Sequence, residues 1–336
     1  MRSVLGLVAL SACAVPVDEP TVDSVEQHGV NMQGVNMQGV NMQGFSLDGI
    51  TLNGDLRNAR VERGELVAER GAVTLRGGAL AGARLLAQAI DAAGATHSLE
   101  YRIASVAAES TAYDPTRTGG TFLYTIEQHV GDSWVPACEA DQDGRRVAIP
   151  VAATFDVTGA RVEVPGMFTF GCTTGVIAKC YRWGYKPWLG GYGGAEFSDL
   201  HWACTRMARA DYCGDGTPHT RNGTAINTWD RLPYPGPIQK HGLLSPLGML
   251  FEAGWNTGGA ACVSRARWLL DDGLQLANLC PDRLVPPGLL GATVCDTVVE
   301  VLFQDPDALL FNESYLNINL DLGLGVGVSG ILNVNL

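Results

Sequence analysis

The chain has 336 residues, of which 46% are hydrophobic and 17% are charged, and this composition is typical of a folded protein with a substantial core. Its formal net charge is −12, so its surface repels phosphate backbones and no nucleic-acid partner is expected. The length suggests two domains, and charges of both signs are interspersed, so no acidic tail is predicted.

The N-terminal residues have the pattern of an export signal. Arg2 precedes the apolar run VLGLVAL and a few small residues, so residues 1–12 are predicted to be a signal peptide. The sequence Leu-Ser-Ala-Cys resembles the lipobox of bacterial lipoproteins, which implies cleavage before Cys13 and acylation of its sulfur. Residues 13–28 then form an acylated tether, and a membrane is the first expected partner. By the same resemblance, Ala14 favours the outer membrane of a Gram-negative bacterium; the alternative is an ordinary signal peptide cut nearby.

Residues 29–58 carry a five-residue repeat, with GVNMQ three times and then GFSLD and GITLN. Apolar and polar residues alternate within each unit, and the glycine permits a sharp corner. The run resembles the pentapeptide-repeat solenoid, but its register fails after Gly54, where Arg57 occupies the next central position. Because five units make little more than one coil, the run must dock on another part of the protein or act as a spacer.

The region 60–171 is predicted to be rich in β-structure. Alternating apolar residues and Gly, Pro or Asp breaks indicate short antiparallel strands at 72–78, 121–130, 145–157 and 167–172. The segment 79–94 is rich in alanine and leucine and is compatible with a helix.

The region 172–308 is predicted to be linked by disulfides. Beside Cys13 the chain has eight cysteines, and an even set in an exported protein indicates a disulfide framework, with 105 pairings left open. These residues are Cys138, Cys172, Cys180, Cys204, Cys213, Cys262, Cys280 and Cys295.

Two helices are predicted in this region. The first covers 199–211, with Ser198 as its N-cap and Gly214 ending it, because apolar residues recur along one stripe. The second lies near 260–279. The expected fold class is therefore β-rich α+β, with antiparallel strands, a disulfide-linked region containing two or more helices, and a short pentapeptide-like repeat at the N-terminus.

Two further features bear on partners. Glycine-spaced aromatic residues could form a platform for a glycan or a peptide, or could simply fill the core; they are Trp183, Tyr185, Trp188 and Tyr192. The tail 309–336 alternates apolar residues with Asn, Asp and Gly, which predicts a strand over 316–328. That strand must add to a sheet, pair with a second copy of the chain, or stack on the N-terminal repeat.

The stretch ADYCGDGTPHT at 210–220 gives the most specific resemblance. Together with its surroundings at 204–230 and the upstream GVIAKCYRWGYKPW at 175–188, it resembles the ADYC domain over about 100–300. The resemblance implies a bacterial secreted protein or lipoprotein and supplies no activity.

The local chemistry of this stretch leads to two expectations. Cys204 and Cys213 lie about half a turn apart around the predicted helix, so they should not bond to each other. Asp211 is unfavourable against the helix dipole unless Arg206, Arg209 or a backbone donor compensates it.

Three interpretations of the 211–230 loop remain open. A hydrolase would use His219 or His201 as base, one of three carboxylates to orient it, and a hydroxyl nucleophile; the candidates are Asp211, Asp215, Asp230, Thr217, Thr220 and Ser198. A calcium site would use the same carboxylates, above all Asp211 and Asp215. In the third interpretation these aspartates bond backbone amides and His219 lies at the surface. No motif indicates a cofactor, and a non-catalytic binding, adhesion or envelope-structural role is favoured.

Overall fold

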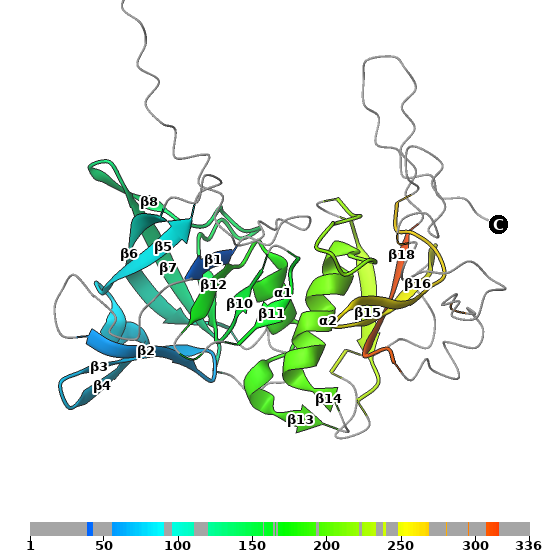
Figure 1. Ribbon diagram of the computed structural model, residues 1–336, viewed down its shortest axis with the longest axis horizontal. Coiled ribbons are helices and arrows are strands. Elements are labelled where there is room, and N and C mark those ends of the chain that lie inside the picture. Colours follow the sequence, from blue (N-terminus) through cyan, green and yellow to red (C-terminus); the bar gives the residue numbers. More distant parts are fainter. Residues whose placement is uncertain are drawn as a thin grey trace, which may run out of the picture.

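The computed structural model describes a strand-rich protein in which two helices lie between two antiparallel sheets (Figure 1). The described residues are 39–42, 56–90, 96–110, 120–192 except 157, 164 and 166, 195–221, 224–232, 238–239, 248–268, 280, 295 and 307–315. Within these ranges no helix is long and apolar enough to cross a membrane.

The first sheet has seven strands in the order β1-β12-β9-β7-β6-β5, with β8 paired to β7. Its strands are β5 (Arg84–Ile90), β6 (Thr96–Ala108), β7 (Phe122–Val130), β8 (Ser133–Pro136), β9 (Ala148–Val151), β12 (Phe168–Cys172) and β1 (Gly39–Met42). Tyr101 and Ile103 on β6 are fully buried while Arg102 between them is only half-buried, so the alternation that predicted strands places one face of the sheet in the core.

The described residues also form three smaller sheets. A meander of three strands, β2 (Leu56–Glu62), β3 (Glu65–Arg70) and β4 (Val73–Arg76), packs its buried Leu56 and Leu66 against the same core. Two short ribbons join β10 (Thr154–Phe155) to β11 (Arg161–Val162) and β13 (Gly191–Tyr192) to β14 (Ala195–Glu196).

The second sheet has four strands in the order β15-β18-β16-β17. These are β15 (Ile226–Asp230), β16 (Met249–Asn256), β17 (Gly259–Val263) and β18 (Leu310–Tyr315). The strand from the C-terminal tail therefore lies inside the sheet, between β15 and β16 (Figure 1).

The two helices are held by packing and by a disulfide. In α1 (Val176–Arg182) and α2 (Phe197–Arg209), Cys180 and Cys204 form a disulfide with their Cα atoms 5.8 Å apart. The predicted apolar stripe of α2 is confirmed, because Leu200, Ala203 and Met207 are buried against the second sheet.

All eight cysteines of the predicted framework are paired, with Cα–Cα distances of 5.1–5.8 Å. The remaining bonds are Cys138–Cys172, Cys213–Cys280 and Cys262–Cys295. As expected, Cys204 and Cys213 do not bond to each other; each reaches a different segment.

Several expected elements differ in the structure. The segment 79–94, compatible with a helix by composition, contains the end of a 3-10 turn (Gly77–Leu80) and strand β5. The start of the expected helix 260–279 is strand β17, because its residues pair with β16. Residues 269–279 and the expected strand 316–328 lie outside the described residues.

The two predicted boundaries of α2 also need correction. Helix α2 begins at Phe197 after Glu196, without a side-chain cap from Ser198. Its last residue is Arg209, and Ala210 rather than Gly214 terminates it as the C-cap. Of the predicted repeat region 29–58 the structure describes 39–42, which pairs with β12, and 56–58, which begins β2; the rest of the expected solenoid lies outside the described residues.

Candidate functional site

The ADYC letters at 210–213 mark the end of α2. Ala210 adopts a left-handed conformation with φ 52°, and its N–H bonds to the Met207 carbonyl 3.1 Å away, so the chain leaves the helix sharply. The following loop approaches the turn between β16 and β17 closely: a Cβ at Gly214 would lie 1.8 Å from the Gly258 oxygen. Only glycine fits there, so the loop is fixed against the second sheet.

Asp211 has the compensating partners that its position against the helix dipole requires. Its buried carboxylate lies 2.5 Å from Nη1 of Arg206 and accepts hydrogen bonds from the backbone N–H groups of Gly214 at 2.9 Å and Gly216 at 3.1 Å. Asp215 accepts a bond from the N–H of Thr217 at 2.8 Å. These contacts close the loop on itself, and among the described residues no cluster of His, Cys, Asp and Glu could hold a metal ion.

Tyr212 belongs to a buried polar cluster, which we call the Glu252 cluster and which also contains Arg267, Asn312 and Trp255. The Tyr212 hydroxyl donates to Glu252 at 3.0 Å, and Arg267 contacts both Glu252 oxygens at 3.0 Å. Asn312 donates to Glu252 at 2.8 Å and accepts from the Trp255 indole at 2.7 Å. Four separate segments therefore meet at one carboxylate.

Arg267 also completes the end of α2. Its Nη2 donates to the Met207 carbonyl at 2.8 Å and its Nη1 to the Ala208 carbonyl at 3.1 Å and to Oγ1 of Thr220 at 3.2 Å. Both carbonyls lie at the C-terminal end of α2, where the helix dipole is negative, so a cation there is favourable. Burial acts to raise the pKa of Glu252, but the Arg267 charge and hydrogen bonds outweigh it and lower the pKa.

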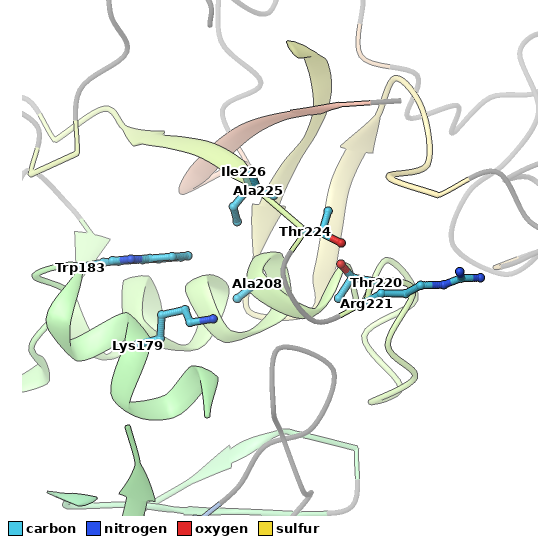
Figure 2. A pocket seen from close by; sticks show the side chains of 8 residues that line it. All are labelled: Lys179, Trp183, Ala208, Thr220, Arg221, Thr224, Ala225 and Ile226. Atoms are coloured by element: carbon cyan, nitrogen blue, oxygen red, sulfur yellow. The ribbon is translucent and has the colours of Figure 1, made fainter. Parts of the chain in front are cut away.

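A pocket of about 270 Å³ lies beside this cluster, between α1, α2 and the segment that leads into β15 (Figure 2). It is lined by Lys179, Trp183, Ala208, Thr220, Arg221, Thr224, Ala225 and Ile226. Figure 2 shows Lys179 and Trp183 entering from α1 and its C-terminal end, the hydroxyls of Thr220 and Thr224 turned toward each other, and the Arg221 guanidinium pointing away.

The two histidines proposed as a catalytic base are separated from carboxylate partners. His201 is fully buried; its Nε2 donates to the Ile177 carbonyl at 3.0 Å, and burial lowers its pKa to about 3. His219, expected at the surface, is half-buried and stacks on Tyr212, and burial lowers its pKa. In the described part of the chain, neither ring forms a hydrogen bond or ion pair with a carboxylate.

The third carboxylate, Asp230, also has structural partners. Burial raises its pKa, although it accepts hydrogen bonds from the N–H groups of Leu232 at 3.2 Å and Gln239 at 2.8 Å and from the Tyr185 hydroxyl at 3.1 Å. Among the hydroxyl candidates, Thr220 lines the pocket, while Thr217 is exposed and Ser198 half-buried on the first turn of α2.

The four aromatic residues proposed as a platform differ in burial and surroundings. Tyr185 is fully buried, so it cannot belong to an exposed surface. Trp188 packs on the turn after β2, where a Cβ at Gly64 would lie 2.3 Å from its ring. Tyr192 is in β13, and Trp183 alone of the four lines the pocket.

Lys179 was absent from the sequence-based candidates. The chain has only three lysines, Lys179, Lys186 and Lys240, and Lys179 interrupts the apolar run GVIAKC. A charged residue within such a run is the signal that could have identified it, because an ammonium group is seldom buried without a function or a partner.

The comparisons with known proteins give one match. The sequence profile of the ADYC domain matches residues 77–269, which is more than half of the chain. The match begins earlier than the range of about 100–300 that was expected from the motif. The matched range includes β5 to β17, both helices and the pocket residues. No curated protein and no solved structure matches the chain.

Proposed function

This chain belongs to the ADYC domain family, and from that membership and its disulfides we propose that it is an exported, lipid-anchored binding protein whose ligand occupies the pocket beside the Glu252 cluster. Four disulfides are compatible with an oxidising compartment outside the cytosol. The pocket is the observation that carries the binding role, because it combines an apolar wall with polar groups on a rigid, cross-linked frame.

A binding role accounts better for the geometry than hydrolysis does. The candidate aspartates are engaged by backbone amides and by Arg206 or Tyr185, and the nearby histidines do not contact them. A hydrolase needs a base within hydrogen-bond reach of both its orienting group and its nucleophile. Self-association through the 316–328 strand is a separate proposal for a segment outside the described residues.

The binding role predicts a change in Trp183 fluorescence when a ligand fills the pocket. The mature protein would be titrated with neutral sugars, short peptides and small organic acids, and at least one class should change the emission with a saturable dose dependence. Trp183→Phe should abolish the signal, whereas Trp134→Phe on β8, outside the pocket, should retain it. If all three classes leave the emission unchanged, and no thermal shift appears, the binding role is wrong.

Lipid anchoring at Cys13 is a separate part of the proposal and has its own test. Cells expressing the full chain would be grown with a clickable fatty-acid analogue, and the wild-type protein should be labelled and recovered with membranes. Cys13→Ser should remove the label. The control variant Ser11→Ala, in which Cys13 is unchanged, should keep it. Labelling that persists in the Cys13 variant would contradict the anchor without affecting the pocket.

A further inference from the structure

Lys179 is the unexplained charge of the pocket. It lies on α1, is half-buried, and in the described part of the chain no hydrogen bond or ion pair joins its Nζ to another group. Burial, and then the positive charge of Arg267, lower its pKa. Arg267 is itself compensated by Glu252, whereas nothing in the described structure compensates Lys179. An ammonium group in this position therefore gains from a bound anion.

The two hydroxyls of the pocket can also donate hydrogen bonds to a ligand. Thr220 accepts a hydrogen bond from Arg267 at 3.2 Å, and Thr224 accepts one from the Trp268 indole at 3.1 Å. Among the described residues neither hydroxyl donates a hydrogen bond, so both hydroxyl protons are available to a ligand. Lys179, Thr220 and Thr224 together form a set of donors, which matches a ligand group that is rich in acceptors and negatively charged.

The apolar side chains of the pocket indicate what kind of molecule carries the anionic group. Trp183, Ala208 and Ile226 supply an apolar wall, and a volume of about 270 Å³ admits a body of modest size next to the anion. A fully hydrated inorganic anion would leave this wall unused. A flat or short apolar body would pack on the Trp183 ring and bury it from water.

We propose that the pocket binds a small organic carboxylate, with its oxygens at Lys179 and the two threonine hydroxyls and its apolar body against Trp183. This inference rests on the proposed binding role and adds the chemical class of the ligand. The other cation of the lining, Arg221, is exposed and lies with its guanidinium 4.2 Å from the Trp268 ring centroid, so Lys179 supplies the charge inside the pocket.

Three probes separate the two halves of the proposed ligand. Benzoate carries both the carboxylate and the apolar body, benzyl alcohol lacks the charge, and sulfate lacks the body. Calorimetric titration should show benzoate binding about tenfold or more tightly than either of the others. Lys179→Met should weaken benzoate about tenfold, and Lys179→Arg should weaken it less, while Arg84→Met on β5 should have no effect.

A second measurement needs no substitution and works even if the Lys179 variants misfold. Wild-type protein would be acetylated with an amine reagent and its three lysines followed by mass spectrometry. Benzoate should slow acetylation of Lys179, and benzyl alcohol at the same concentration should not. Equal binding of benzoate and benzyl alcohol, or sugar or peptide binding with no organic-acid binding, overturns the carboxylate proposal and leaves the binding role intact. Failure of every probe class overturns both.

Discussion

Replacement of Arg267 by methionine is expected to lower the free energy of unfolding by about 3–5 kcal/mol, as measured by urea denaturation at pH 7. Arg267 and Glu252 are both buried, and the guanidinium supplies the only positive charge in contact with that carboxylate among the described residues. Without it, Glu252 is left as a buried, uncompensated charge, and the Met207 and Ala208 carbonyls at the end of α2 each lose the hydrogen bond that Arg267 donates.

The pH dependence of the stability lost in Arg267→Met distinguishes an uncompensated buried charge from a simple packing defect. Burial alone raises a carboxyl pKa, so Glu252 should titrate at higher pH once Arg267 is gone. The difference in stability between the variant and the wild-type protein should therefore shrink toward acid pH. A difference of constant size from pH 7 to pH 5 would show that lost packing, not charge, explains the effect.

Two control variants test whether the effect of Arg267→Met comes from the buried ion pair. The double variant Glu252→Leu/Arg267→Met removes both charges and should recover part of the lost stability. Arg60→Met breaks a half-exposed ion pair with Glu62 on β2 and should cost no more than about 1 kcal/mol. If Arg60→Met and Arg267→Met cost the same, the Glu252 cluster does not hold the second sheet to α2.

The features that the sequence predicted well are those with a local physical cause. The stripe of α2 follows from apolar spacing around one helix, and the failure of Cys204 to bond Cys213 follows from their angular separation. Asp211 needed a partner because of the helix dipole, and Arg206 and two loop amides supply it. Each of these inferences involves residues of one helix or of the loop that directly follows it.

The features that were missed depend on segments far apart in the chain. The segment 259–263 has the alanine content of a helix, yet it becomes β17 because β16 offers it hydrogen-bond partners. Asp230 and Tyr185 are 45 residues apart and meet only in the fold, so neither could be assigned to the interior beforehand. Lys179 has no motif at all, since its pocket is completed by residues more than 25 positions away.

A second large effect is expected at acid pH, from His201. Its folded-state pKa of about 3 lies below the ordinary value of 6.5, because burial disfavours the charged ring. The unfolded chain therefore takes up a proton near pH 6.5 while the folded protein does not. The contribution of the neutral ring to the free energy of unfolding is therefore complete above pH 6.5 and is lost as the pH falls toward 3. The loss is about 1.4 kcal/mol per pH unit and about 4–5 kcal/mol in total.

The measurement is the free energy of unfolding between pH 7 and pH 5, where the carboxyl groups with lowered pKa values contribute little. His201→Gln can still donate to the Ile177 carbonyl but cannot titrate, so its stability should vary less steeply with pH than that of the wild type. His219→Gln should reduce the slope to a smaller extent, because that ring is only half-buried. A His201→Gln variant with the wild-type slope would mean that the ring accepts a proton in the folded protein, and that the contact between α1 and α2 admits water.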